Sequence, residues 1–217
     1  MIKNYKYAIF DLDGTLLDTA EDLADSVNFA LAKASLETRS LEDVKRFVGN
    51  GVANLIRRSL PENTSEEIFH GVFEDFKRHY EGNMSNKTLP FDGIAELLKE
   101  LCERGVGISV ASNKYQQGVE YLCELFFHGL YSAALGEREG ITRKPDPSIV
   151  LTAISEMGGK KEQTVYIGDS EVDGQTAKNA GVDFIGVSWG LRAVELLYES
   201  GALTVVDSPE QLLEYFI

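Results

Sequence analysis

Short apolar runs that alternate with amphipathic stretches constrain the fold of this chain more than any other feature. Six such runs are rich in β-branched or aromatic residues, and each is short enough to be one buried strand. They lie at Tyr5–Phe10, Val106–Ala111, Tyr131–Leu135, Thr164–Ile167, Asp183–Val187 and Leu203–Val206. Helical periodicity fills the stretches Phe91–Arg104, Tyr115–Phe127, Pro147–Met157, Val172–Ala180 and Arg192–Glu199. Strands that alternate with helices predict an α/β fold with a doubly wound, Rossmann-like parallel sheet.

The interval between the first and second runs breaks this alternation. Residues 17–85 show helical periodicity without a strand signal. Gly, Asn and Ser cluster at Gly82–Lys87, which indicates a hinge where the chain returns to the strand-helix pattern. We therefore predict a second, smaller all-helical domain at 17–85, inserted into a catalytic core domain made of 1–16 and 86–217.

Helix-start signals divide the inserted interval into about four helices. Thr19–Asp22 and Ser40–Asp43 both have the spacing of a capping box, in which a hydroxyl and a carboxylate cap the first turn reciprocally. The segment Pro61–Thr64 indicates a break, and Ser65–Glu81 is predicted to be the helix that follows it.

The charge and cysteine content exclude several classes of partner. The 217-residue chain has 21 basic and 35 acidic side chains and a formal net charge of -14, whereas nucleic-acid binding needs clustered cations. Two cysteines, Cys102 and Cys123, make neither a disulfide framework nor a zinc spacing. No apolar stretch approaches the length of a membrane span or a signal-peptide core. We expect a cytoplasmic monomer or homodimer that acts on a small molecule.

Two pairs of aspartates follow predicted strands. Asp11 and Asp13 come directly after the first run, and Asp169 and Asp173 come after the fourth. Ligands of open α/β sheets bind at the carboxyl ends of strands, and clustered carboxylates repel one another unless a cation compensates. Because Mg²⁺ prefers carboxylate oxygens, the pattern predicts a magnesium site. Taken singly, the same aspartates are also explained by an Asp-Gly turn and by helix N-caps.

Polar residues that suit an anion lie near two further strand ends. Ser112 and Asn113 end the second run, and Lys144 precedes Pro145 at the start of a predicted helix. A serine N-cap and a solvated surface lysine are the ordinary interpretations. Beside an acidic metal site, however, a hydroxyl, an amide and an ammonium group are suited to bind a phosphoryl group.

These segments, taken in chain order, resemble the four motifs of the haloacid dehalogenase superfamily. The motifs are Asp11-Leu-Asp13-Gly14-Thr15, the hydroxyl of Ser112, Lys144-Pro145 and Gly168-Asp169-Ser-x-x-Asp173, and they span essentially the whole chain. Phe47-Val-Gly49-Asn50-Gly51 is similar to the glycine-bearing cap loop of the phosphoglycolate phosphatase branch. The resemblance implies a phosphatase with a helical cap that hydrolyses a small, phosphoglycolate-like phosphate monoester and uses Mg²⁺ as its cofactor.

The resemblance also implies a role for each matching residue of the core. Asp11 would be the nucleophile that forms an aspartyl-phosphate, and Asp13 would be the general acid and base. Ser112, Asn113 and Lys144 would hold the phosphoryl oxygens. The implied substrate-binding residues of the core are Gly14, Thr15 and Asn113.

The metal and cap assignments follow from the same resemblance. Mg²⁺ would be bound by the Asp11 and Asp169 side chains and the Asp13 carbonyl. Asp173 would be a further ligand, direct or through water, or would orient Lys144. In the cap, Gly49 and Asn50 are implied to touch the substrate, with Arg57 or Arg58 as further candidates. Their ordinary alternatives are a helix start and solvated arginines.

Alternative functions stay open at this point. The phosphomutases of the superfamily share the four motifs, but their cap carries a Lys-Gly pair followed by Val-Ser-Arg, which this cap loop lacks. Pyrophosphatase or nucleotidase activity fits the same motifs. Outside enzymes, a phospho-accepting signalling module would be about half this length and have no cap, and a silent binding protein would not need every catalytic position filled. Trp189 and Arg192 match no motif.

Overall fold

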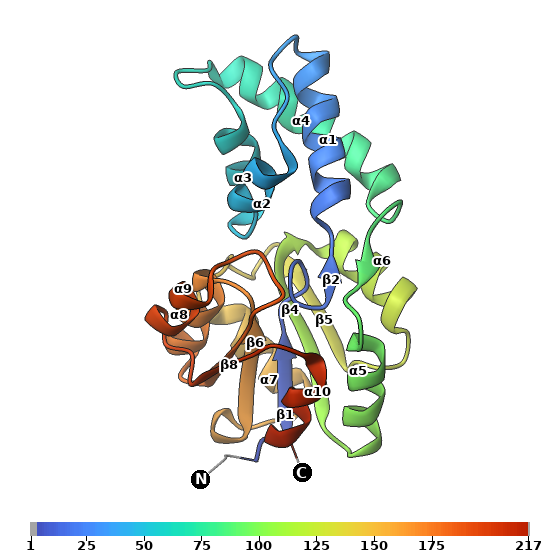
Figure 1. Cartoon of the computed structure of the whole chain (residues 1–217), viewed down its shortest axis with the longest axis vertical. Helices are drawn as coiled ribbons and strands as arrows, with labels where there is room; N and C mark the ends of the chain where they lie inside the picture. Colours follow the sequence, from blue (N-terminus) through green and yellow to red (C-terminus); the bar gives the residue numbers. More distant parts are fainter. Residues whose placement is uncertain (1–3, 217) are drawn as a thin grey trace. The chain divides into compact units, whose positions relative to one another are not determined.

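The computed structural model describes residues 4–216 (Figure 1). Its strands are β1 (Tyr7–Phe10), β2 (Leu17–Asp18), β3 (Leu89–Pro90), β4 (Gly107–Tyr115), β5 (Ala133–Glu137), β6 (Thr164–Gly168), β7 (Asp183–Val187) and β8 (Thr204–Val206). Its α-helices are α1 (Ala20–Lys33), α2 (Leu41–Phe47), α3 (Gly51–Ser59), α4 (Glu66–Asn83), α5 (Ile94–Glu103), α6 (Gln116–Phe127), α7 (Ser148–Glu156), α8 (Glu171–Ala180), α9 (Val194–Glu199) and α10 (Pro209–Leu212). Short 3-10 turns occupy Lys161–Gln163 and Leu213–Tyr215.

Six parallel strands form the main sheet in the order β5-β4-β1-β6-β7-β8. The predicted doubly wound parallel sheet is therefore confirmed. The strand order reverses at β1, which pairs with β4 on one side and β6 on the other. Phe10, the last residue of β1, lies opposite Val110 and Ile167. This register brings the residues that follow β1 and β6 beside the last residues of β4, at the edge of the sheet where ligands of such folds bind.

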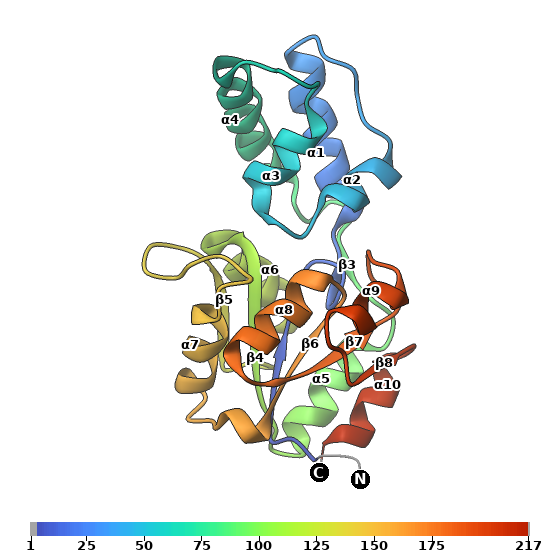
Figure 2. The ribbon, with the colours of Figure 1, turned by 90° about the vertical axis from the view of Figure 1, so that its left-hand side faces the viewer.

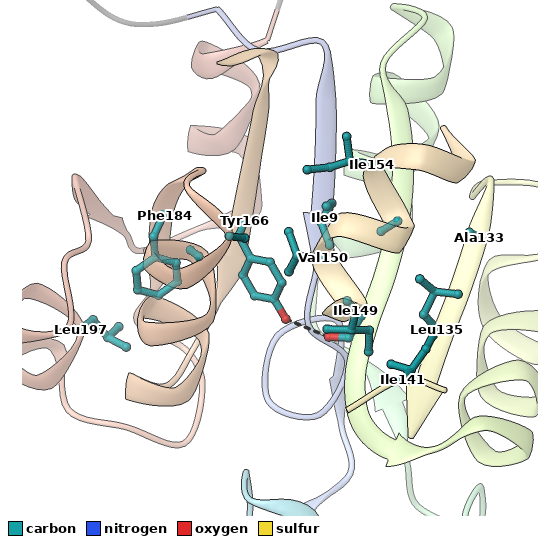
Figure 3. Close-up of a cluster of buried hydrophobic side chains, with 14 residues drawn as sticks. Ile9, Ala133, Leu135, Ile141, Ile149, Val150, Ile154, Tyr166, Phe184 and Leu197 are labelled. Atoms are coloured by element: carbon teal, nitrogen blue, oxygen red, sulfur yellow. Dashed lines mark hydrogen bonds between the residues drawn. The ribbon is translucent and has the colours of Figure 1, made fainter. Parts of the chain in front are cut away.

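Helices cover both faces of this sheet (Figure 2). α7 and α8 pack against each other on one face, and α5 and α10 pack on the other. Tyr166 of β6 is fully buried among the apolar side chains under α7, and its hydroxyl donates a hydrogen bond to the Ala111 carbonyl at 2.8 Å (Figure 3). Within residues 4–216, no helix combines the length and the apolar character that crossing a bilayer requires.

The second strand of the main sheet, β4, extends beyond the predicted run. Its apolar segment ends at Ala111, but pairing with β5 carries the strand on to Tyr115, which lies opposite Glu137. Gly136 of β5 also donates its N–H to the Gln116 side chain at 2.7 Å. These contacts join segments about twenty residues apart, which local periodicity does not report.

Residues 18–89 form a separate compact unit of four helices. α1 packs against α2 and α4, and α3 packs against α2 and α4. Its core contains the fully buried Phe76 and Tyr80, whose rings stack with centroids 5.4 Å apart. All four helices lie within residues 17–85, the interval for which helical periodicity predicted an all-helical unit. The other unit consists of the residues up to Leu17 and from Pro90 onward.

Asp22 explains why the segment before Pro90 belongs to the helical unit. Its carboxylate accepts hydrogen bonds from the Lys87 and Thr88 backbone N–H groups and from the Thr88 hydroxyl, at 2.8 to 3.1 Å. The unit therefore continues to Leu89, whereas the predicted boundary lies after residue 85.

The two predicted capping boxes have different outcomes. The box at Ser40 and Asp43 is confirmed, because each side chain accepts from the other's backbone N–H. The box at Thr19 is wrong, since Thr19 makes no side-chain cap hydrogen bond to α1. The carboxylate of Asp22, which would complete that box, is used for the segment before Pro90 instead.

Candidate active site

Asp11 occupies the point where the strand order of the sheet reverses. It follows β1 directly, and its backbone N–H donates to the Ile167 carbonyl at 2.9 Å. This bond extends the β1–β6 ladder by one residue and fixes the direction in which the side chain leaves the strand. Asp11 is buried, with 7% of its surface exposed.

Asp169 and Asp173 complete a buried acidic cluster with Asp11. One carboxylate oxygen from each lies within 4.8 Å of the other two. Asp169 follows β6, and Asp173 is in the first turn of α8, where its Oδ2 accepts from the Ser170 N–H and hydroxyl in a capping box. Asp11 is thus brought to Asp169 and Asp173, which are far from it in the sequence, by two neighbouring strand ends.

Lys144 supplies the cation inside this cluster. Its ammonium group lies 2.9 Å from Asp11 Oδ1 and 2.7 Å from Asp173 Oδ1. It also donates to the Tyr166 hydroxyl at 3.0 Å and to the Ala111 carbonyl at 3.2 Å. Burial lowers the pKa of Lys144, but Asp11 and Asp173 outweigh burial and hold that pKa well above its usual value. Lys144 is therefore a permanently charged, fixed cation.

The acidic cluster carries more negative charge than Lys144 can balance. With all groups ionised, three carboxylates face one ammonium group, which leaves two negative charges in a buried site. Burial raises the pKa of Asp11 to about 8, with Lys144 opposing and the two other carboxylates adding to the rise. Burial likewise raises the pKa of Asp169 to about 7. Ionised carboxylates are disfavoured here in the absence of a further cation.

The residues present fit a divalent metal ion. Asp11 Oδ1 is fully buried and accepts no hydrogen bond, although the Lys144 ammonium lies near it. This oxygen has the capacity for another ligand. Carboxylate oxygens are the donors that Mg²⁺ prefers, and two positive charges would neutralise the cluster. Asp11 and Asp169 are best placed to hold such an ion. Asp173 Oδ1 contacts the Lys144 ammonium and its Oδ2 accepts from two Ser170 donors, whereas each oxygen of Asp169 accepts a single hydrogen bond and keeps a lone pair for a metal.

Asp13, Gly14 and Thr15 form the loop that follows Asp11. Asp13 Oδ1 lies 3.0 Å from the ammonium group of Lys114, which is almost fully buried. Gly14 has φ +89°, and a Cβ at this position would lie 2.5 Å from Asp169 Oδ2, so only glycine fits. The Thr15 hydroxyl donates to Asp169 Oδ1 at 3.3 Å. The loop therefore contacts both the acidic cluster and a second lysine.

Ser112 and Asn113 belong to the last residues of β4. The ordinary interpretation of Ser112 as a helix N-cap is wrong, because α6 begins at Gln116 and its N-cap residue is Tyr115. Ser112 is buried, and its hydroxyl oxygen accepts from the Lys114 N–H at 3.2 Å, so its own proton remains available to a ligand. The Asn113 side chain bonds the Lys144 backbone on both sides, accepting from its N–H at 2.8 Å and donating to its carbonyl at 3.3 Å. Asn113 thereby holds Lys144 in place.

The cap candidates belong to the helical unit, and their predicted contact with substrate stays a prediction. Gly49 has φ +111°, and Asn50 is the N-cap residue of α3 without a side-chain cap hydrogen bond. Arg57 makes two hydrogen bonds to Glu66, at 2.9 and 3.0 Å, and lies over the Phe69 ring. Arg58 donates to the Phe47 carbonyl. Both arginines therefore have structural roles within the unit.

Sequence reasoning assigned no role to several residues that contact the acidic cluster or the loop after Asp11. Lys114 directly follows Ser112 and Asn113 in the sequence. It is buried against Asp13 because β4 extends to Tyr115. The indole N–H of Trp189 donates to the Thr15 carbonyl at 3.0 Å, and the Leu191 N–H donates to Asp169 Oδ2 at 2.6 Å. The one available signal was position, because this segment follows β7 at the same edge of the sheet.

The raised carboxyl pKa values predict an inverse pH dependence of stability without metal. The ordinary pKa of an aspartate is 3.8, and burial raises that of Asp11 to about 8 and that of Asp169 to about 7 in the folded chain. Between these values the folded state holds protons that the unfolded state has released, so the free energy of unfolding falls as pH rises. We expect urea unfolding in EDTA to show lower stability at about pH 8 than at about pH 5, with a slope of up to about 1.4 kcal/mol per pH unit for each proton.

Magnesium is expected to flatten this dependence, because bound metal favours the ionised carboxylates. Asp169→Asn is the matched variant, and it should reduce the slope measured in EDTA. Stability that rises with pH in EDTA between these limits would contradict the assignment.

Comparison with known proteins agrees with this geometry. The family described as haloacid dehalogenase-like hydrolase matches residues 8–187. The chain is 36% identical to the phosphoglycolate phosphatase of Cereibacter sphaeroides, covering 96% of this chain and 98% of that one. It is 35% identical to the phosphoglycolate phosphatase of Agrobacterium fabrum, covering 88% of this chain and 83% of the relative.

Solved structures give the same result. A protein from Lactobacillus delbrueckii subsp. bulgaricus, assigned as a phosphoglycolate phosphatase, superposes with a TM-score of 0.93 at 37% identity over 99% of both chains. Sequence and fold therefore agree across the sheet and the inserted helices α1–α4, which correspond to the cap of these proteins. Together with the buried aspartates and Lys144, these matches show that the chain belongs to the haloacid dehalogenase-like hydrolase family.

Proposed function

We propose that this chain is a magnesium-dependent phosphatase that hydrolyses small organic phosphate monoesters through an aspartyl-phosphate on Asp11. The observation that carries the proposal is the environment of Asp11 Oδ1. This oxygen is buried, accepts no hydrogen bond, and lies 2.9 Å from a fixed cation at the switch point of the sheet. A carboxylate is an effective nucleophile at phosphorus only where such charges neutralise the phosphoryl oxygens.

Two displacement steps follow from the placement of the residues. In the first, an Asp11 carboxylate oxygen attacks phosphorus, the ester P–O bond breaks, and the leaving oxygen takes a proton from Asp13. In the second, water attacks the aspartyl-phosphate while Asp13 takes a proton from that water, which releases phosphate and restores Asp11. Ser112 and Lys144 hold the phosphoryl oxygens during both steps.

Mg²⁺ would be held by the Asp11 and Asp169 side chains and the Asp13 carbonyl, with Asp173 as a further ligand directly or through water. When bound, it neutralises charge on the phosphoryl group and on the cluster. The contacts of Asp173 favour its alternative role, since its Oδ1 contacts Lys144 at 2.7 Å. Gly14, Thr15 and Asn113 are proposed to shape the substrate-binding site by holding the groups that contact it.

A phosphoglycolate-like substrate is supported by the names of the curated relatives. A chain with a net charge of -14 repels anions in general, so a small anionic monoester needs the local cations of this site. The proposed location is the cytoplasm, and the cysteines Cys102 and Cys123 are free thiols that suit a reducing compartment.

A panel of phosphate esters tests the proposal. We expect Mg²⁺-dependent release of phosphate, with kcat/KM highest for small acidic monoesters and lower for sugar phosphates, nucleotides and pyrophosphate. EDTA should abolish turnover. Transfer of phosphate to a second hydroxyl of a sugar phosphate would identify a phosphomutase instead. A stable phosphorylated protein without release would identify a phospho-accepting signalling module.

Lys114→Met is expected to slow turnover by roughly 10- to 100-fold, less than the roughly 10²- to 10⁴-fold of general acid-base catalysis, because Asp13 itself remains. Lys114 holds Asp13 Oδ1 at 3.0 Å in a nearly buried ion pair, so its loss removes a partner that orients the acid/base group. The effect should fall on kcat for alkyl phosphates, whose leaving oxygen needs a proton.

An activated aryl ester provides the internal control for Lys114→Met. Its leaving group departs without protonation, so p-nitrophenyl phosphate hydrolysis should lose less activity in the variant. An equal loss on alkyl and aryl esters would show that Lys114 does not act through Asp13.

A further inference from the structure

The segment Ser188–Arg192, which matches no motif, folds back onto Asp169. It follows β7 directly, and its Leu191 N–H donates to Asp169 Oδ2 at 2.6 Å. The fit between the two segments is tight, because a Cβ at Gly190 would lie 2.2 Å from the Cβ of Asp169. No side chain larger than hydrogen fits at position 190 without moving the aspartate.

The same segment also contacts the loop that follows Asp11. The indole N–H of Trp189 donates to the Thr15 carbonyl at 3.0 Å. The hydroxyl of Thr15 in turn donates to Asp169 Oδ1 at 3.3 Å. Each carboxylate oxygen of Asp169 thus has one donor, and the two donors are linked through Trp189. This arrangement fixes the rotation of the Asp169 carboxylate from two sides.

The charges of the segment act in the same direction. Arg192 Nε lies 3.1 Å from Glu171 Oε2, which places a guanidinium group at the start of α8. A hydrogen-bond donor on Asp169 Oδ2 and a guanidinium group in the same segment both suit an ionised carboxylate, which is the form that binds a cation.

We infer that Ser188–Arg192 is a positioning segment that orients the Asp169 carboxylate for a divalent cation and couples it to the loop carrying Asp13 and Thr15. Trp189 and Gly190 are its main positioning residues. The inference rests on the proposed function, since it deepens the assignment of Asp169 as a metal ligand. It also assigns a role to Trp189, the single tryptophan of the chain, which matches none of the sequence motifs.

Metal affinity tests the inference directly. Binding of Mn²⁺ to the full chain is measured by electron paramagnetic resonance, with Mg²⁺ as competitor. Loss of a group that orients a metal ligand typically weakens affinity about 10- to 100-fold. We expect an increase of that size in the Mn²⁺ dissociation constant for Trp189→Phe, which keeps an aromatic side chain but loses the indole N–H donor. Gly190→Ala should have at least as large an effect, because its methyl group displaces Asp169.

Gly71→Ala is the matched control, since a Cβ there meets no atom within 4 Å, and its Mn²⁺ affinity should equal that of the wild type. Thermal unfolding in EDTA separates binding from folding. Unchanged Mn²⁺ affinity in both Trp189→Phe and Gly190→Ala would overturn the inference, whether or not their unfolding temperatures in EDTA fall.

Asp169→Asn distinguishes failure of the inference from failure of the proposed site. If Asp169→Asn loses Mn²⁺ binding while both segment variants bind normally, the positioning role is wrong and the metal site stands. If Asp169→Asn binds Mn²⁺ like the wild type, the metal site itself is wrong, and the inference is overturned with it.

Discussion

Replacing Asp11 with asparagine is expected to lower kcat/KM for any phosphate monoester by at least about four orders of magnitude, because the nucleophile is lost. The carboxamide has nearly the same shape but no negative charge to form a bond to phosphorus. Folding should survive, since burial disfavours the charged form of Asp11 in the wild type. We expect Asp11→Asn to unfold in EDTA at the same temperature as the wild type or higher.

Asp13→Asn gives the matched comparison. It should also lose turnover, but it keeps the Asp11 nucleophile, so a covalent phosphate can accumulate when the water-activating base is missing. Intact-protein mass spectrometry after incubation with substrate and Mg²⁺ should detect one added phosphoryl group in Asp13→Asn and none in Asp11→Asn. Retained turnover in the Asp11 variant would falsify the nucleophile assignment.

Lys144→Met is expected to reduce kcat by about 10²- to 10³-fold, the usual effect of removing one group that stabilises the transition-state charge. It should also destabilise the metal-free protein, since Asp11 and Asp173 both lose their ion pair with the same ammonium group. Breaking a buried pair costs about 3–5 kcal/mol when the remaining charge is left alone.

The destabilisation has a pH signature that separates it from a packing defect. Protonation removes the charge from the carboxylates of Asp11 and Asp173 that have lost their ion pair. The difference in unfolding free energy between Lys144→Met and the wild type should therefore shrink toward acidic pH. Urea unfolding in EDTA at several pH values measures this difference. A difference in unfolding free energy that does not change with pH would mean that Lys144 stabilises the fold through packing. Full activity in Lys144→Met would show that Lys144 has no catalytic role.

Much of the fold could be predicted because its strands are buried on both faces. The strands of a parallel sheet covered by helices are continuous apolar runs, and the run before Asp11 and the run before Asp169 are both of this kind. The helical periodicity of 17–85 had an equally local cause. The end of β4 has no local signal in the sequence, since Tyr115 becomes part of the strand only by pairing with Glu137.

The residues of the candidate site likewise divide into those that local sequence signals indicate and those that depend on distant partners. Asp11 and Asp169 are indicated by sequence because each follows a strand directly, and Lys144 because a proline follows it. Asp22 contacts Lys87 and Thr88, which are 65 and 66 positions away. Lys114 contacts Asp13 across 101 positions, and Trp189 contacts Thr15 across 174. No periodicity or cap rule contains such distances. Residues that hold other residues in place are therefore the ones that sequence reasoning missed.

The short strands β2 and β3 have a consequence for how this chain can be rebuilt. They pair with each other, and the Phe91 N–H donates to the Leu16 carbonyl at 3.2 Å, so the chain leaves the sheet unit and returns to it at neighbouring points. An insertion whose ends lie together adds little loop-closure entropy to the host. The junction is therefore suited to grafting, in which the four-helix unit is exchanged for one from a relative while the residues of the candidate active site stay untouched.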